Sequence, residues 1–150
     1  MGVEISLTGK NAIVTGGGGG MGRCTARMLA RAGANVLVSD MDGAAAEETV
    51  AQIKAESDVK ALSMVCNVTS KADIDRMVAA ALDAFGRIDI LNHIAGVFGA
   101  VDFLEATEAD YDKQLDINTK GTFFVDQAVL KAMIPNRAGK IVNMCSQAGK

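Results

Sequence analysis

A run of glycines between two regular segments is the feature that most limits what this chain can fold into. The residues Gly16–Gly20, followed by Met21 and Gly22, come directly after the apolar residues 12–14 and before a helical pattern over 23–32. Five consecutive glycines cost conformational entropy on folding, so they favour a turn that something approaches closely. A glycine turn between a buried strand and a helix presents backbone N–H groups at the positive end of the helix dipole. It favours a phosphate and, in a βαβ unit, the pyrophosphate of a dinucleotide.

Strand and helix signals alternate along the rest of the chain. The expected strands are 11–15, 35–39, 60–66, 88–92 and 140–145, and the expected helices are 20–31, 44–56, 71–85 and a long one over 107–134. Thr69 or Ser70 can cap the third helix, and Gly33, Gly86 and Pro135 mark helix ends. This alternation predicts an α/β fold with a parallel sheet and helices on both faces. No repeat or linker divides the sequence, so we expect one domain over residues 1–150.

Composition and charge exclude several classes of protein. The net charge is -3 and the sequence pI is about 5.1, so no basic surface points to a nucleic acid or an anionic membrane as partner. No segment approaches the roughly 18 apolar residues that a membrane span needs. The three cysteines, Cys24, Cys66 and Cys145, are widely spaced and form no CxxC pair. They favour a reducing, cytoplasmic location over a disulfide framework.

An acidic residue, Asp40, ends the second expected strand. A carboxylate at this position accepts hydrogen bonds from the adenosine ribose hydroxyls and repels a 2′-phosphate. No Lys or Arg occupies positions 17–19 or 41 to offset its charge, and Arg23 lies inside the following helix. The residues therefore favour NAD(H) over NADP(H). The alternative is a surface aspartate that begins a turn with residues 42–43.

Several segments resemble motifs of the short-chain dehydrogenase/reductase family. Residues 15–22 match its TGxxxGxG cofactor turn, and Asn67-Val68 resembles the Asp/Asn-Val pair that contacts the adenine. Residues 116–123 (DINTKGTF) resemble the helix motif with the active-site Asn, and residues 141–149 (IVNMCSQAG) resemble the fifth strand that ends in the catalytic Ser. These motifs follow the family's order and spacing over essentially the whole chain.

The resemblance implies a Rossmann-type, doubly wound parallel sheet with strand order 3-2-1-4-5. It implies an NAD-dependent oxidoreductase that interconverts a small secondary alcohol and a ketone by hydride transfer, assembled as a homodimer or homotetramer through the long helix. No metal is expected. The implied catalytic residues are Ser146, which would bind the substrate oxygen, and Asn118, which would hold a water. The alternatives for these two are a turn serine and a helix amide bonded to nearby backbone. The implied cofactor-binding residues are Gly16, Gly18, Gly20, Met21, Gly22, Asp40, Asn67, Val68, Ile94, Ala95 and Gly96.

The sequence departs from the family pattern in two places. The fourth strand leaves through His93-Ile94-Ala95-Gly96 where the family has Asn-Asn-Ala-Gly, so any side-chain bracing must come from His93, with one donor and one acceptor. The YxxxK motif that holds the family's catalytic Tyr and Lys does not occur in the 150 residues. Tyr111 is the one tyrosine, and Leu115 stands four positions after it. We therefore predict that the 150-residue chain alone is inactive.

The fifth strand is expected at the edge of the sheet, with no helix after it to cover it. This favours the N-terminal portion of a longer dehydrogenase over a genuinely short relative. Two other functions remain open. One is a non-catalytic dinucleotide-binding or assembly module, which would not need the Tyr and Lys. The other is a 3-oxoacyl-carrier-protein reductase, which shares the Asn-Val pair but usually takes NADPH, and Asp40 argues against it.

Overall fold

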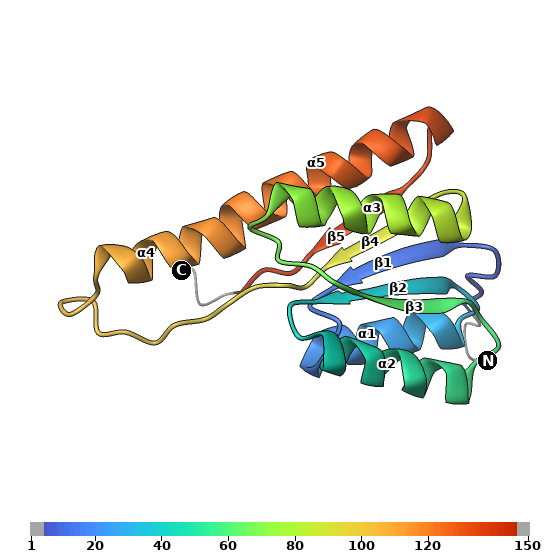
Figure 1. The fold of residues 1–150 in the computed structure, drawn as a ribbon, viewed down its shortest axis with the longest axis horizontal. Helices are drawn as coiled ribbons and strands as arrows, with labels where there is room; N and C mark the ends of the chain where they lie inside the picture. Colours follow the sequence, from blue (N-terminus) through green and yellow to red (C-terminus); the bar gives the residue numbers. More distant parts are fainter. Residues whose placement is uncertain (1–4, 147–150) are drawn as a thin grey trace.

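The computed structural model describes residues 5–146, which form a five-stranded parallel sheet between two layers of helices (Figure 1). The strands are β1 (Asn11–Thr15), β2 (Asn35–Asp40), β3 (Ala61–Val65), β4 (Ile90–His93) and β5 (Lys140–Asn143). They lie in the order β3-β2-β1-β4-β5, and every neighbouring pair is parallel. The predicted doubly wound sheet with strand order 3-2-1-4-5 is confirmed.

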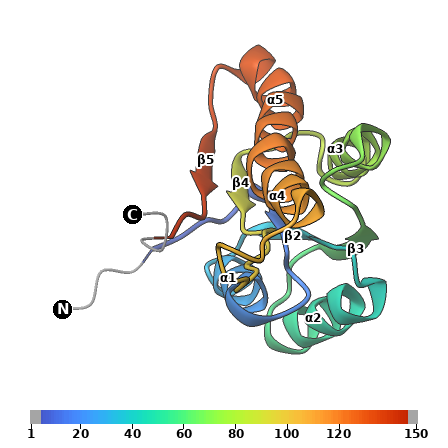
Figure 2. The same ribbon diagram turned by 90° about the vertical axis from the view of Figure 1, so that its left-hand side faces the viewer.

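Helices cover both faces of the sheet, as the alternating pattern requires. Helices α1 (Gly20–Arg31) and α2 (Gly43–Glu56) lie on one face, and α3 (Lys71–Phe85) and α5 (Thr122–Met133) lie on the other (Figure 2). Helix α4 (Glu108–Leu115) extends past the edge of the sheet where the strands end (Figure 1). The carboxyl ends of the strands are therefore flanked by the start of α1 on one side and by α4 on the other.

Alternate side chains of the central strands build two cores. Ile13 of β1 and Leu37 of β2 pack with α3 and α5, whereas Val14 and Val38 pack with α1 and α2. All four side chains are fully buried, and burial of each contributes about 1.5–3 kcal/mol. Strand β1 is buried at every position, which is typical of a central strand covered on both faces.

The helix ends follow their capping residues. The Ser70 hydroxyl accepts a hydrogen bond from the backbone N–H of Asp73 at 3.3 Å, so Ser70 caps α3, and Gly86 ends that helix with a φ of 80°. Helix α2 begins at Gly43, one residue before the expected start, because the Asp42 side chain accepts from the N–H of Ala45 and caps it there.

The expected single α-helix over 107–134 is wrong in its middle. Thr107 and Asp110 form a capping box that starts α4, but the chain then makes a π-helical turn, η1 (Asp116–Gly121), before α5 begins. A 3₁₀ turn with Pro135 follows over Ile134–Asn136. No proline interrupts residues 108–133, so no strong helix breaker in the sequence signals the π turn.

Strand β5 is an edge strand among the residues that the structure describes. It pairs with β4, and Val142 at its centre is 54% exposed. The predicted strand 88–92 corresponds to β4, which begins two residues later at Ile90. Within residues 5–146, no helix has both the length and the apolar character that crossing a bilayer demands.

Candidate functional site

The first half of the glycine turn, at the carboxyl end of β1, is packed so tightly that only glycine fits. Gly16 has a φ of +65°, and a Cβ there would lie 2.8 Å from the backbone nitrogen of Ala95. A Cβ on Gly17 would lie 2.6 Å from a methyl group of Val38, and a Cβ on Gly22 would overlap the carbonyl oxygen of Gly16. The glycines therefore let β1, the start of α1 and the segment after β4 approach one another closely.

The second half of the turn is open. A Cβ on Gly19 or on Gly20 would meet no atom within 4 Å. Gly19 is the N-cap residue of α1 and, as a glycine, has no side chain to cap the helix. The first N–H groups of an α-helix have no partner inside the helix. The positive end of α1 thus faces open space with donors available, and this arrangement fits a phosphate group.

Strand β2 and helix α2 hold the turn in place. The N–H of Gly17 donates to the carbonyl oxygen of Ser39 at 3.0 Å, and the N–H of Gly18 donates to Oδ2 of Asp40 at 2.9 Å. The hydroxyl of Thr49, on α2, donates to the carbonyl oxygen of Gly17 at 2.9 Å. These hydrogen bonds fix the backbone of Gly17 and Gly18, which directly precede the open half of the turn.

Arg23 also contacts the turn, although it lies inside α1. Its Nη2 donates to the carbonyl oxygen of Gly18 at 2.6 Å, and its Nε donates to the hydroxyl of Thr49 at 3.0 Å. The two terminal nitrogens donate to the two carboxylate oxygens of Glu48, each at 2.9 Å. In this bidentate ion pair the charge of Glu48 offsets that of Arg23, which is the cation nearest the turn in the sequence.

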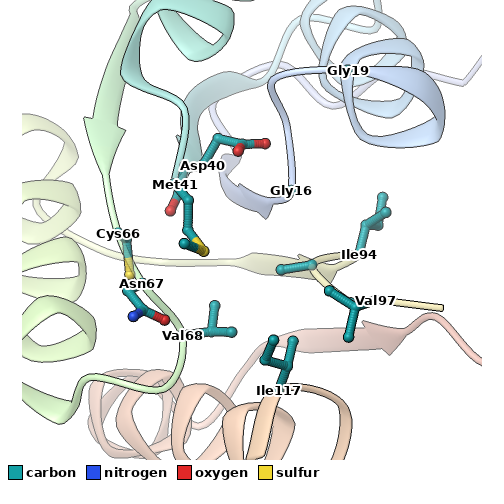
Figure 3. A pocket seen from close by; sticks show the side chains of 13 residues that line it. Gly16, Gly19, Asp40, Met41, Cys66, Asn67, Val68, Ile94, Val97 and Ile117 are labelled. Carbon is teal, nitrogen blue, oxygen red and sulfur yellow. The ribbon is translucent and has the colours of Figure 1, made fainter. Parts of the chain in front are cut away.

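A cavity of about 330 Å³ lies beside the turn, along the carboxyl ends of β3, β2, β1 and β4, and it includes the point between β1 and β4 (Figure 3). The sheet order reverses between these two strands, and doubly wound sheets bind ligands at such a point. The lining residues are Gly16, Gly19, Ser39, Asp40, Met41, Cys66, Asn67, Val68, Ile94, Ala95, Gly96, Val97 and Ile117.

Asp40 lies at the end of β2, beside the turn (Figure 3). Its Oδ2 accepts from Gly18, and its Oδ1 accepts from the N–H of Asp42 at 3.0 Å. An ionised carboxylate has about four lone-pair sites, so each oxygen of Asp40 can accept a further hydrogen bond. The carboxylate is thus fixed in direction and still able to bind hydroxyl groups.

The residues after β3 form another wall of the cavity. The carbonyl oxygen of the Asn67 side chain accepts from the N–H and the hydroxyl of Thr69, at 3.0 and 2.9 Å. The backbone N–H of Asn67 donates to Asp73, which lowers the pKa of that carboxyl. Burial raises the pKa of the Cys66 thiol to about 11, so this wall presents a neutral thiol and not a nucleophile. Among residues 5–146, no group of three or more His, Cys, Asp or Glu side chains is placed to hold a metal ion.

Asn118 lies in the π turn and binds the segment after β4. Its Oδ1 accepts from the N–H of Val97, and its Nδ2 donates to the carbonyl oxygen of Val97, both at 2.9 Å. The amide therefore bonds to backbone 21 residues away in the chain, and its Nδ2 also contacts the side chain of Gln114 one helical turn earlier, at 2.9 Å. Its neighbour Ile117 lines the cavity, so the π turn and the exit from β4 are joined at the cavity wall.

Ser146 is exposed and follows β5 at the same edge of the sheet. The N–H of Met144 donates to the carbonyl oxygen of His93 at 2.9 Å and continues the β4–β5 pairing toward it. The side chain of His93 is bonded to the end of β1, where its Nδ1 lies 2.9 Å from the Thr15 hydroxyl.

Seven of the residues predicted from the sequence as cofactor-binding line the cavity: Gly16, Asp40, Asn67, Val68, Ile94, Ala95 and Gly96. Gly18, Gly20, Met21 and Gly22 lie in the turn and at the start of α1 but not in the lining, and neither do Asn118 and Ser146. The sequence prediction missed Gly19, Ser39, Met41, Cys66, Val97 and Ile117. Each of these six adjoins a predicted residue, so the flanks of the motifs were a signal for Gly19, Ser39, Met41 and Cys66, whereas Val97 and Ile117 depend on how the chain folds. A residue's position in the cavity lining does not assign it a role, so the cofactor-binding and catalytic roles remain predictions.

Comparison with known proteins gives one consistent family. The family model described as short chain dehydrogenase matches residues 10–150. The chain is 43% identical over 147 residues to a sorbitol dehydrogenase of Cereibacter sphaeroides, covering 97% of this chain and 56% of that protein. It is 40% identical over 147 residues to a galactitol 2-dehydrogenase of Agrobacterium fabrum (strain C58 / ATCC 33970), with the same two coverages. A crystal structure of NAD⁺-bound xylitol dehydrogenase superposes with a TM-score of 0.91 at 38% identity, covering 95% of this chain and 55% of that one. The chain thus spans a little over half the length of these relatives.

Proposed function

The chain belongs to the short-chain dehydrogenase family, and from this premise we propose that the protein is an NAD-dependent oxidoreductase that interconverts a secondary alcohol and a ketone. The observation that carries the proposal is the half-open glycine turn beside a cavity that also holds Asp40. Three of the relatives are named as dehydrogenases of sorbitol, galactitol and xylitol. Those names support a small polyhydroxylated alcohol, or its ketone, as the substrate class.

The cavity and the glycine turn together offer a separate binding place for each part of a dinucleotide. The open N–H groups at the start of α1 would bind the pyrophosphate, Asp40 would accept from the adenosine ribose, and Asn67 and Val68 would flank the adenine. Ile94, Ala95 and Gly96 would lie along the nicotinamide half. When bound, the dinucleotide supplies or accepts the hydride. The chain's own part is to hold it and to exclude water with apolar side chains.

The preference for NAD rests on charge. Asp40 presents a carboxylate where NADP carries its 2′-phosphate, and like charges at that distance repel. Arg23 is the cation that could offset this repulsion, but its guanidinium is paired with both oxygens of Glu48. The proposed specificity therefore depends on Glu48 as well as on Asp40.

Ser146 and Asn118 are the proposed catalytic residues of this chain. The Ser146 hydroxyl would donate a hydrogen bond to the substrate oxygen, and Asn118 would hold a water in a proton relay. The π turn around Asn118 supports such a role, since π turns occur often at functional sites. The 150 residues contain no YxxxK motif, so they offer no general acid for the alcohol proton. We expect no turnover from the 150-residue chain alone, and steady NADH production from an added polyol would contradict this.

The assembly and location are also proposals. Helix α5 exposes Phe123 and Leu130, and the 3₁₀ turn after it exposes Ile134; together they form an apolar surface that suits a homodimer or homotetramer. The described residues hold three free cysteines, which suits a reducing cytoplasm. A non-catalytic dinucleotide-binding module is the second candidate, because the glycine turn and Asp40 would hold a dinucleotide whether or not a reaction follows. Turnover by the natural protein would exclude it.

Titration of the natural protein with NAD and with NADP tests the proposal. We expect NAD to bind more tightly, because only NADP meets the repulsion of Asp40. Tighter binding of NADP would overturn the cofactor assignment. Failure of both dinucleotides to bind would overturn the proposed function itself.

A further inference from the structure

The end of β4 places one imidazole between the two neighbouring strands. His93 is the one histidine of the 150-residue chain, and its side chain is 2% exposed. In the sheet register it lies opposite Thr15 of β1 on one side and Asn143 of β5 on the other. The side chain of Thr15 is fully buried. Whatever hydrogen bonds His93 makes are therefore made without competition from solvent.

The contacts of the Thr15 hydroxyl fix the tautomer of His93. The backbone N–H groups of Ile94 and Ala95 both lie 3.2 Å from the Thr15 oxygen, and they can only donate to it. A hydroxyl oxygen has two lone pairs and one proton. With both lone pairs used, the proton is left for the Nδ1 of His93, 2.9 Å away. Nδ1 is therefore an acceptor, and the proton of the neutral imidazole is on Nε2.

A carboxylate on α5, that of Asp126, acts on the ring of His93 through its charge. Among the described residues, Nε2 of His93 and Oδ1 of Asp126 are both buried without a hydrogen-bond partner. The other carboxylate oxygen of Asp126 accepts from the side chain of Asn143 at 2.7 Å. Thr15 alone therefore sets the tautomer, and the N–H that it leaves on Nε2 has no hydrogen-bond partner among the described residues.

His93 is neutral at neutral pH. Burial lowers the pKa of the imidazole, and the negative charge of Asp126 opposes this with a smaller effect. β1 and β5 present Thr15 and Asn143 to the ring, and neither carries a charge. The net direction is toward a pKa below the ordinary value of a histidine.

The Thr15 hydroxyl ties this ring to the candidate cofactor pocket. Thr15 directly precedes Gly16, and the two N–H groups that it accepts from belong to the turn that packs against Gly16. Gly16, Ile94 and Ala95 all line the cavity. We propose that His93 is a positioning residue of the dinucleotide pocket, which it serves as a neutral imidazole by orienting the Thr15 hydroxyl against the backbone of residues 94–95. This inference rests on the proposed function.

Protonation of His93 would undo the arrangement. Nδ1 would then carry a proton that points at the proton of the Thr15 hydroxyl. The hydroxyl would have to rotate, and one of its two backbone donors would lose its acceptor. Loss of one net hydrogen bond corresponds to a change of about three- to tenfold in an equilibrium constant.

The first experiment tests the tautomer without any cofactor. Nitrogen-15 NMR of the imidazole in the natural protein, with H93N to assign the signals, should show the proton on Nε2 at neutral pH. A proton on Nδ1, or fast exchange between the two tautomers, would overturn the inference whether or not NAD binds.

The second experiment tests the link to the pocket. The dissociation constant of NAD is measured from about pH 8 down to the lowest pH at which circular dichroism shows a folded protein, because His93 protonates below the ordinary histidine value of about 6.5. We expect it to rise about three- to tenfold in the wild type. In H93N it should stay flat, because an amide accepts from Thr15 without titrating. H93L, which has no acceptor, should bind NAD about three- to tenfold more weakly even at high pH. The same pH response in wild type and H93N would overturn the inference. Absence of NAD binding at every pH would instead overturn the proposed function.

Discussion

Replacing Gly16 with alanine should destabilise the protein by more than the cost of its positive φ alone. At a φ of +65°, an L-residue costs about 1–2 kcal/mol. Its Cβ would also lie 2.8 Å from the nitrogen and 2.9 Å from the Cα of Ala95, backbone atoms that cannot rotate away. Overpacking of this kind typically costs about 1–3 kcal/mol. The expected loss in the free energy of unfolding is therefore about 2–5 kcal/mol.

Two other glycines separate the two contributions. Gly86 has a φ of +80°, and a Cβ there would meet nothing within 4 Å. Gly86→Ala should therefore show the backbone contribution alone, about 1–2 kcal/mol. Gly19 has neither a positive φ nor a close neighbour, so Gly19→Ala should cost only the difference between glycine and alanine as the N-cap of α1, about 0.5–1 kcal/mol.

Urea unfolding followed by circular dichroism measures all three variants in the natural protein. The order of destabilisation should be Gly16→Ala, then Gly86→Ala, then Gly19→Ala. Equal losses for Gly16→Ala and Gly86→Ala would refute the argument, because the close approach of Ala95 would then have no energetic effect. NAD titration adds a second readout, since Gly86→Ala, at the far end of α3, should leave the dissociation constant unchanged.

Three further predictions concern charge. Asp40→Ala should narrow the ratio of the NADP to the NAD dissociation constants, whereas Asp83→Ala, which removes an exposed carboxylate on α3, should leave that ratio unchanged; no difference between the two variants would exclude Asp40 as the discriminator. Glu48→Gln should strengthen NADP binding without weakening NAD, because it frees the charge of Arg23 beside the turn; an unchanged NADP affinity would show that Arg23 does not reach the phosphate. The folded state binds the His93 proton less readily than the unfolded state, so its contribution to stability should be present above about pH 6.5 and be lost as the pH falls through the lowered pKa. The urea midpoint of H93N should therefore lack the decrease that His93 protonation causes at low pH. Equal decreases in the urea midpoints of wild type and H93N would contradict this prediction.

The regular part of the fold was predictable because its elements have clear chemical boundaries. Helices α1 and α3 match their predicted bounds, since glycines and Ser70 mark their ends. The predicted start of β4 lies two residues before Ile90, in a segment whose hydrogen-bonded pairing with the neighbouring strands has already begun. The N–H of Asp89 already donates to Asn11, and the carbonyl oxygen of Asp89 accepts from Lys140.

The candidate site was predictable where it depends on glycine or charge, and not where it depends on topology. Gly16 and Asp40 carry local chemical signals that the sequence displays. Val97 and Ile117 are ordinary apolar residues, and they meet at the cavity only because the π turn lies against the exit of β4. The partners of His93 were hidden for the same reason, since Thr15 is 78 residues earlier in the chain.

The π turn also determines how the segment from α4 to α5 tolerates the gain or loss of a residue. A π turn holds one residue more than an α turn, and each residue of an α-helix advances the direction of its side chain by about 100°. The extra residue is absorbed within residues 116–121, so α4 keeps its orientation relative to α5. Loss of a single residue there would close the wide turn without rotating either helix, and it would withdraw Asn118 from Val97. Natural variation in length at this point would therefore change the wall of the cavity while sparing the core beneath α5.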